Sequence, residues 1–229
     1  MSQVVTVPAT TRGFDCNATI NAAAAAALFT HGYRFAARYI RRREARSSDL
    51  SLTEIAVLHR AGLAISIVQH VERDGPPWWT PWAEKGTEYG ITAARACGEL
   101  TIPRGVTVWL DLEGIMPGTD VGQVDAYCRA WFEPVQRAGY VPGLYVGYGA
   151  VLGPAALYRL PFTRYFAAYN LDEDQYPATR GCCMRQHEQK AGDVPTGVAF
   201  PLDTDVVEAD ALGGLPTMFA PDEWDGALA

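Results

Sequence analysis

The sequence predicts a (β/α)8 barrel, and three observations support this fold class. Strand-like and helix-like segments alternate along the 229 residues, which is typical of an α/β fold with a mostly parallel sheet. Eight strand-like segments occur, the number that closes such a barrel. Most of them are nearly continuous apolar runs, as expected of strands covered on both faces. An open doubly wound sheet is the alternative, but no glycine-rich nucleotide-binding motif follows the first strand-like segment.

The expected strands are short runs rich in apolar and aromatic residues. They comprise residues 11–17, 33–40, 63–71, 106–113, 141–149, 164–170, 182–188 and 201–207. Each ends at or just before polar or turn-forming residues, which is how a strand boundary is recognised in a sequence.

Helices are expected between most of these strands, at residues 20–32, 51–62, 82–100, 121–139 and 150–159. Ser51 with Glu54 three residues later has the capping-box pattern that begins a helix. Gly86 and Gly90 should weaken the third helix, and Pro134 should interrupt the fourth. We expect a compact barrel with only weak helices after strands six and seven.

The length and composition are those of one globular unit. Hydrophobic residues make up 48% of the chain and charged residues 20%, so a sizeable core is available. We expect a single domain over residues 1–229, with its core at about 12–215 and a loosely packed tail at 216–229. Five cysteines without a CxxC pair indicate buried thiols rather than disulfides or a zinc site.

Charge and hydropathy exclude several classes of function. The net charge of −7 argues against a nucleic-acid partner, which needs a basic surface. No apolar run is long enough to insert into a membrane. The first residues lack the pattern of a secretory signal peptide, so any action outside the cytoplasm requires a non-classical route. We expect a monomer without a metal or another cofactor.

The fourth expected strand, "VTVWLDLEG" at residues 106–114, ends in two carboxylates, Asp111 and Glu113. Side chains two apart in a strand point to the same face, so the two acids should lie side by side. In an α/β barrel the carboxyl ends of the strands form the functional face. Acids beside an apolar interior are costly unless they are paired, protonated or functional.

Polar residues also end the other expected strands. If the barrel forms, its mouth collects acids, tyrosines and amides. These are Asp15, Tyr39, Gln69, Tyr145, Tyr148, Tyr169, Gln186, Asp203 and Asp205. The loop "GPPWWTPW" at residues 75–82 adds Trp78 and Trp79, which could stack on sugar rings or cap the core.

Such a set suits the cleavage of a glycosidic bond. A carboxylic acid commonly protonates the leaving oxygen, and a second carboxylate or the substrate's acetamide assists. We assign Glu113 as the acid, with Asp111 orienting it or stabilising the developing positive charge. A structural hydrogen-bonded pair is the alternative for these two. Asp15 is equally a site residue or the N-cap of the next helix, and the basic segment at 38–46 is a solvated loop or a contact for acidic groups.

Several motifs resemble the family 25 glycoside hydrolases, which are lysozymes. They are "GFDCN", "VWLDLEG", "YFAAYN", "MRQHE" and "PLDTDVV", spread over residues 12–215. The resemblance is closer to a related bacterial and phage family, a glycoside-hydrolase-like domain of unknown function. The lysozymes usually have Asp-x-Ser where this chain has "DCN". Family 18 chitinases want DxDxE, but Trp109 stands at the first acidic position.

The resemblance implies a muramidase-type site on a (β/α)8-like barrel. Asp15, Asp111, Glu113 and Asp203 would be its catalytic acids, with Asp205 two positions on. Tyr169 and Gln186 match substrate-lining positions. The leading hypothesis is a hydrolase of peptidoglycan glycan strands that cleaves an N-acetylated β-1,4 bond. A barrel that binds a glycan without cutting it, and a purely structural domain, are the alternatives.

Overall fold

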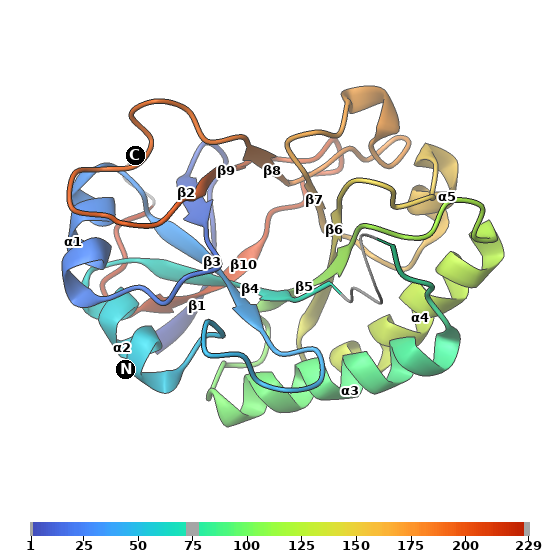
Figure 1. Cartoon of the computed structure of the whole chain (residues 1–229), viewed down its shortest axis with the longest axis horizontal. Helices are drawn as coiled ribbons and strands as arrows, with labels where there is room; N and C mark the ends of the chain where they lie inside the picture. Colours follow the sequence, from blue (N-terminus) through green and yellow to red (C-terminus); the bar gives the residue numbers. More distant parts are fainter. Residues whose placement is uncertain (1, 72–77, 227–229) are drawn as a thin grey trace.

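The strands close into a barrel in the computed structural model of the protein, which describes residues 2–71 and 78–226 (Figure 1). Over these two ranges, ten strands form one sheet in the order β1-β10-β4-β3-β2-β9-β8-β7-β6-β5. A further pairing joins β4 to β5, so the strands β2 to β9 form a closed ring of eight. The predicted barrel is confirmed.

The barrel strands are β2 (Arg12–Asp15), β3 (Phe35–Ile40), β4 (Ala64–Gln69), β5 (Thr107–Leu112), β6 (Val141–Val146), β7 (Tyr165–Ala167), β8 (Met184–His187) and β9 (Asp203–Val207). The helices are α1 (Ala22–Thr30), α2 (Leu52–Arg60), α3 (Ala83–Glu99), α4 (Val121–Arg137) and α5 (Pro154–Arg159), with one 3-10 turn, η1 (Glu173–Gln175). Two further strands, β1 (Ser2–Thr6) and β10 (Thr217–Pro221), lie outside the ring.

The last barrel strand runs in the opposite direction to the others. The strands β2 to β8 pair in parallel, whereas β9 is antiparallel to both β8 and β2. A parallel connection needs a crossover element, usually a helix, but residues 188–202 form no helix. The chain therefore returns directly, and β9 begins at the mouth of the barrel, where β8 ends.

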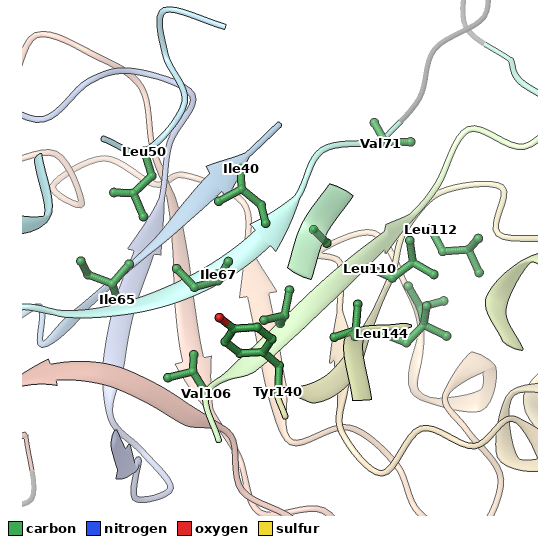
Figure 2. Close-up of a cluster of buried hydrophobic side chains, with 14 of the residues drawn as sticks. Ile40, Leu50, Ile65, Ile67, Val71, Val106, Leu110, Leu112, Tyr140 and Leu144 are labelled. Atoms are coloured by element: carbon green, nitrogen blue, oxygen red, sulfur yellow. The ribbon is translucent and has the colours of Figure 1, made fainter. Parts of the chain in front are cut away.

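Side-chain alternation divides the apolar residues into two cores. An outer core lies between the barrel wall and the helices, and Figure 2 shows part of it, with Ile67, Leu110 and Leu144 from neighbouring strands. A smaller core fills the barrel interior and includes Trp109, whose ring meets Phe166 edge-on at 5.6 Å between centroids. The interior is therefore packed with side chains, and a ligand can enter only at its mouth.

Two long helices pack closely along one side of the barrel (Figure 1). A Cβ atom on Gly86 would come within 2.4 Å of the Tyr127 carbonyl oxygen, and one on Gly90 within 2.5 Å of the Trp131 carbonyl oxygen. These two glycines therefore allow α3 to approach α4 closely, in addition to lowering the helix propensity of α3. The expected interruption at Pro134 is wrong, because α4 continues through it to Arg137.

The C-terminal segment is not a loose tail. Residues 217–221 form β10, which pairs antiparallel with β1 and joins β4 at Phe219 and Ile65. Phe219 is buried with both of its neighbours, and Thr217 donates its backbone N–H to the Thr107 hydroxyl at 3.0 Å. The prediction for 216–229 is thus wrong over β10, while residues 227–229 lie outside the described residues.

The helices after the sixth and seventh predicted strands, which are β7 and β8, are weak, as predicted. Only the single turn η1 follows β7, and residues 188–202 after β8 contain no helix. In the described ranges, no helix is long and apolar enough to span a bilayer.

Candidate functional site

The inward-facing residues at the ends of the strands form the candidate site. On β5, Leu110 and Leu112 join the outer core, so Trp109 and Asp111 point into the barrel. The next inward position after Asp111 is Glu113, just beyond the strand. The sequence-based prediction that both acids share a face therefore follows from the observed alternation.

One side of the mouth is a hydrogen-bonded wall built on β2, β3, β8 and β9. The Tyr39 hydroxyl donates to Asp15 Oδ1 at 3.1 Å, and Gln186 Nε2 donates to Asp15 Oδ2 at 2.7 Å. Gln186 in turn accepts a hydrogen bond from the Tyr145 hydroxyl at 3.0 Å. Asp15 does not cap α1, because the side chain of Asn21 accepts the bond from Ala24 N–H.

Buried carboxyl groups in this wall bind their protons tightly. Burial raises the pKa of Asp15 to about 7, an effect that Gln186 opposes by its hydrogen bond and Asp203 reinforces by its charge. Burial and the neighbouring Asp15 raise the pKa of Asp205 well above its usual value. Both oxygens of Asp205 are buried without a hydrogen-bond partner among the described residues. Near neutral pH at least one of the pair is therefore protonated.

The opposite wall carries Asp111 and Glu113. Asp111 is 5% exposed and accepts a hydrogen bond from Val71 N–H at 3.2 Å. Glu113 is half-buried, and its carboxyl group lies against the backbone of Gly147. A Cβ atom on Gly147 would come within 2.6 Å of Glu113 Oε2. A side chain at position 147 would therefore clash with the carboxyl group of Glu113 in its observed position.

The two walls enclose a cleft of about 630 Å³. Its lining contains Asp15, Cys16, Asn17, Tyr39, Arg46, His70, Val71, Asp111, Glu113, Tyr169, Glu188, Gln189, Pro201, Leu202 and Asp203. A smaller space below it is bordered by Tyr145 and Gln186. Asp203, at the start of β9, accepts a hydrogen bond from Gln189 N–H at 3.1 Å. Asp205 lies two residues deeper and does not line the cleft.

Three residues predicted to bind the substrate are buried away from the cleft, and for them the prediction is wrong. One is Asp205, which is fully buried below Asp203. Gln69 shares the outward face of β4 with Ile65 and Ile67, and it bonds to the Tyr89 carbonyl oxygen and the Trp131 indole behind the wall. Gln69 is the last residue of β4, much as Asp111 lies near the end of β5, and position alone suggested a similar role. The alternation of side chains along β4 nevertheless turns Gln69 outward, with Ile65 and Ile67.

Trp79 cannot stack on a sugar ring either, because its side chain is buried and only 1% exposed. Its indole N–H donates to the Glu113 carbonyl oxygen at 2.6 Å, and its ring packs edge-on against Tyr127. Trp79 thus holds the backbone turn that carries Glu113. Two adjacent tryptophans in an irregular loop gave no sign of which one would be buried.

The remaining predicted aromatic residues lie at the rim. Trp78 is half-buried and lies 5.7 Å from Tyr148 between ring centroids, and Tyr148 is 61% exposed. Neither lines the cleft, whereas the half-exposed Tyr169 does. Residues 75–77 of the aromatic loop lie outside the described residues.

Sequence reasoning gave no role in the site to two residues that shape it. His70 stacks on Tyr39 with ring centroids 4.6 Å apart and nearly parallel planes, and so fixes the phenol that bonds Asp15. Gly147 gives room to Glu113. Its signal was available, because Gly147 is two residues after Tyr145 and shares its inward face.

The arrangement suits acid-assisted cleavage of a neutral bond. Glu113 is partly exposed and can reach a bound molecule, while Asp111 supplies a buried second carboxylate. Tyrosine and amide groups can bond the hydroxyl and acetamido groups of a sugar. In the part of the chain that the structure describes, no three His, Cys, Asp or Glu residues are grouped to hold a metal ion.

Comparison with solved structures shows the same fold. An uncharacterized Bacillus stearothermophilus protein is 18% identical, with a TM-score of 0.60, covering 90% of this chain and 99% of its own. The Mycobacterium tuberculosis Tat-secreted protein Rv2525c, in complex with L-tartrate, is 15% identical, with a TM-score of 0.62 and coverage of 87% and 96%. A muramidase from Trichobolus zukalii is 14% identical, with a TM-score of 0.59 and coverage of 86% and 93%. At these identities the likeness concerns the fold alone.

Sequence comparison identifies the family. No curated protein matches the chain. The model of the Rv2525c-like, glycoside hydrolase-like domain matches residues 26–205, which include β3 to β8, both acids of the β5 wall and the first residues of β9. This match spans most of the chain, and the chain therefore belongs to the Rv2525c-like, glycoside hydrolase-like domain family.

Proposed function

We propose that the protein hydrolyses the glycan strands of peptidoglycan at an N-acetylated β-1,4 glycosidic bond, with Glu113 as the general acid. One observation carries this proposal: the inward-facing strand ends bring Glu113, Asp111 and Asp15 to one cleft of sugar-binding size. The fold shared with a muramidase supports the choice of substrate.

The proposed chemistry assigns a separate role to each wall. Glu113 gives its proton to the leaving oxygen as the bond to the anomeric carbon breaks. The Asp111 carboxylate stabilises the positive charge that develops on the ring or on the assisting acetamide. Water then adds to the anomeric carbon and returns a proton to Glu113. Asp15, held by Tyr39 and Gln186, positions the sugar.

The experiment is the digestion of purified peptidoglycan by the wild type and by Glu113→Gln. That substitution preserves size and hydrogen bonding but removes the acid. New reducing ends from the wild type alone, identified by mass spectrometry of the muropeptides, would support the proposal. Absence of release from several peptidoglycan types would contradict it.

A glycan-binding module without turnover is the second candidate. It is favoured by the β2 wall, where Tyr39 and Gln186 each donate a hydrogen bond to Asp15 and hold this carboxyl group in the fixed orientation of a binding group. Retained glycan affinity without release of reducing ends would select this function.

A further inference from the structure

The basic segment near the start of the β3–α2 loop divides into structural arginines and one that faces the cleft. Arg41 pairs with Glu99 of α3 at 2.5 Å, and Arg43 pairs with Glu88 at 3.9 Å. Arg42 is buried against the Trp79 and Tyr89 rings. These three side chains attach the loop to α3 and its surroundings.

Arg46 differs from them in position and in partners. It lines the cleft, it is exposed, and no described carboxylate forms an ion pair with its guanidinium group. The other charged groups of the lining are acids at positions 15, 111, 113, 188 and 203. Within the described lining Arg46 is thus the one permanent cation.

The backbone that carries Arg46 is fixed. Its N–H donates to Asp49 Oδ2 at 2.8 Å, and its carbonyl oxygen accepts from Asp49 N–H at 3.1 Å. Asp49 is tied to the barrel by His70 Nε2 at 2.9 Å. The Ser48 carbonyl oxygen accepts a bond from the buried Arg38, which pairs with Glu54. A preorganised loop reduces the entropy lost when its side chain binds a ligand.

We propose that Arg46 is a specificity residue that binds a carboxylate carried by the glycan. The ionised acids of this lining repel an anionic ligand, so such a ligand binds best in the orientation that brings its carboxylate to the cation. A guanidinium group binds a carboxylate with two parallel hydrogen bonds. This inference rests on the proposed function and adds to it a preference for acidic over neutral amino-sugar chains. The carboxylate belongs either to a lactyl ether on the sugar or to a peptide attached to it.

The test measures binding by calorimetry, in the Glu113→Gln background so that no ligand is consumed. Three tetrasaccharides serve as probes. The first has free lactyl carboxylates, the second has those groups amide-linked to a dipeptide, and the third is built from N-acetylglucosamine alone and is neutral. Each is titrated into the parent, Arg46→Gln and Arg46→Lys. Arg43→Gln is the control, because it lies in the same loop but pairs with Glu88.

We expect Arg46→Gln to weaken binding of an acidic probe about tenfold and of the neutral probe less than about twofold. Arg46→Lys should keep part of the preference, and added salt should reduce it. Loss on the first probe assigns the lactyl carboxylate, and loss on the second assigns the peptide carboxylate. Unchanged binding of all three probes, or an equal loss on all three, would overturn the role of Arg46 while the proposed function stands. If the parent binds no probe, both proposals fail.

Discussion

The two walls of the cleft carry similar motifs with opposite outcomes. On β5, "DLE" places Asp111 at the mouth and Glu113 beyond the strand, where it is half-buried. On β9, "DTD" places Asp203 at the mouth and Asp205 two residues deeper, where it is fully buried. The strand β5 runs toward the mouth and β9 runs away from it. The second acid of the motif, Glu113, therefore lies nearer the ligand than Asp111, whereas Asp205 lies deeper in the barrel than Asp203.

An acid–x–acid motif on a barrel strand therefore has no fixed chemical role. Its chemistry depends on whether the chain leaves or enters the mouth. We therefore expect the acids of the β5 wall to take part in bond cleavage and the residues of the β2/β9 wall to bind and position the ligand.

The largest expected difference in kcat is between substitutions of Glu113 and of Asp205, the second acid of each motif. Glu113→Gln should lower kcat about 10²–10⁴-fold, because it removes the proton donor. Asp205→Asn is matched in size and should lower kcat less than about tenfold, since this group does not line the cleft. Steady-state release of reducing ends measures both. Equal losses would remove the distinction between the walls.

The adjacent tryptophans separate rim from core. Trp79→Ala should destabilise the protein by about 3–5 kcal/mol, because a fully buried ring is lost. Trp78→Ala should change the free energy of unfolding little and weaken glycan binding instead. Denaturant melts and calorimetric titrations of both variants decide this. A stability loss at Trp78 that matches that at Trp79 would place both rings in the core.

Gly147→Ala should displace the proposed acid without removing it. The added methyl group overlaps the position of Glu113 Oε2, so the carboxyl group must move. We expect kcat to fall at least about tenfold, because catalytic groups need close positioning. The melting temperature should also fall, because the added methyl group comes within 2.7 Å of Glu113 Cβ. Gly153→Ala is the control, since a Cβ atom there meets nothing within 4 Å. Unchanged turnover in Gly147→Ala would show that Glu113 needs no such room.

The buried wall should give a pH dependence of stability. The folded-state pKa of Asp15 is about 7 against an ordinary value of 3.8, so between these values the folded state holds a proton that the unfolded state has released. The free energy of unfolding should therefore fall as the pH rises from about 4 to 7, and Asp205 acts in the same direction. Asp15→Asn should flatten this slope in urea melts. An unchanged slope would contradict a protonated Asp15.

The sequence predicted the parts of the site that depend on alternation within one strand. The apolar run before Asp111 and Glu113 was enough to place both at the mouth, and the same rule, applied to Ile65 and Ile67, turns Gln69 outward. The direction of β9 was not predicted, although the weak helix expected after strand seven already left residues 188–202 without a crossover element.

Features that depend on tertiary contacts were also not predictable. The pairing of β10 with β1 joins residues more than 200 positions apart, so no local pattern in the sequence indicates it. Gly86 and Gly90 indicated a weak helix, whereas the approach of α4 makes them necessary. The separation of Arg46 from its neighbouring arginines depends on which acids α3 presents to the loop.

The role of Glu113 as proton donor is tested most directly by changing the leaving group. The measurement is kcat/KM of the wild type and Glu113→Gln on aryl glycosides of N-acetylated sugars, with phenols of increasing acidity as leaving groups. An acidic phenol departs without protonation, so the deficit of Glu113→Gln should shrink steadily along the series and nearly vanish at its end. A deficit that stays constant across all leaving groups would contradict the assignment of Glu113 as the general acid.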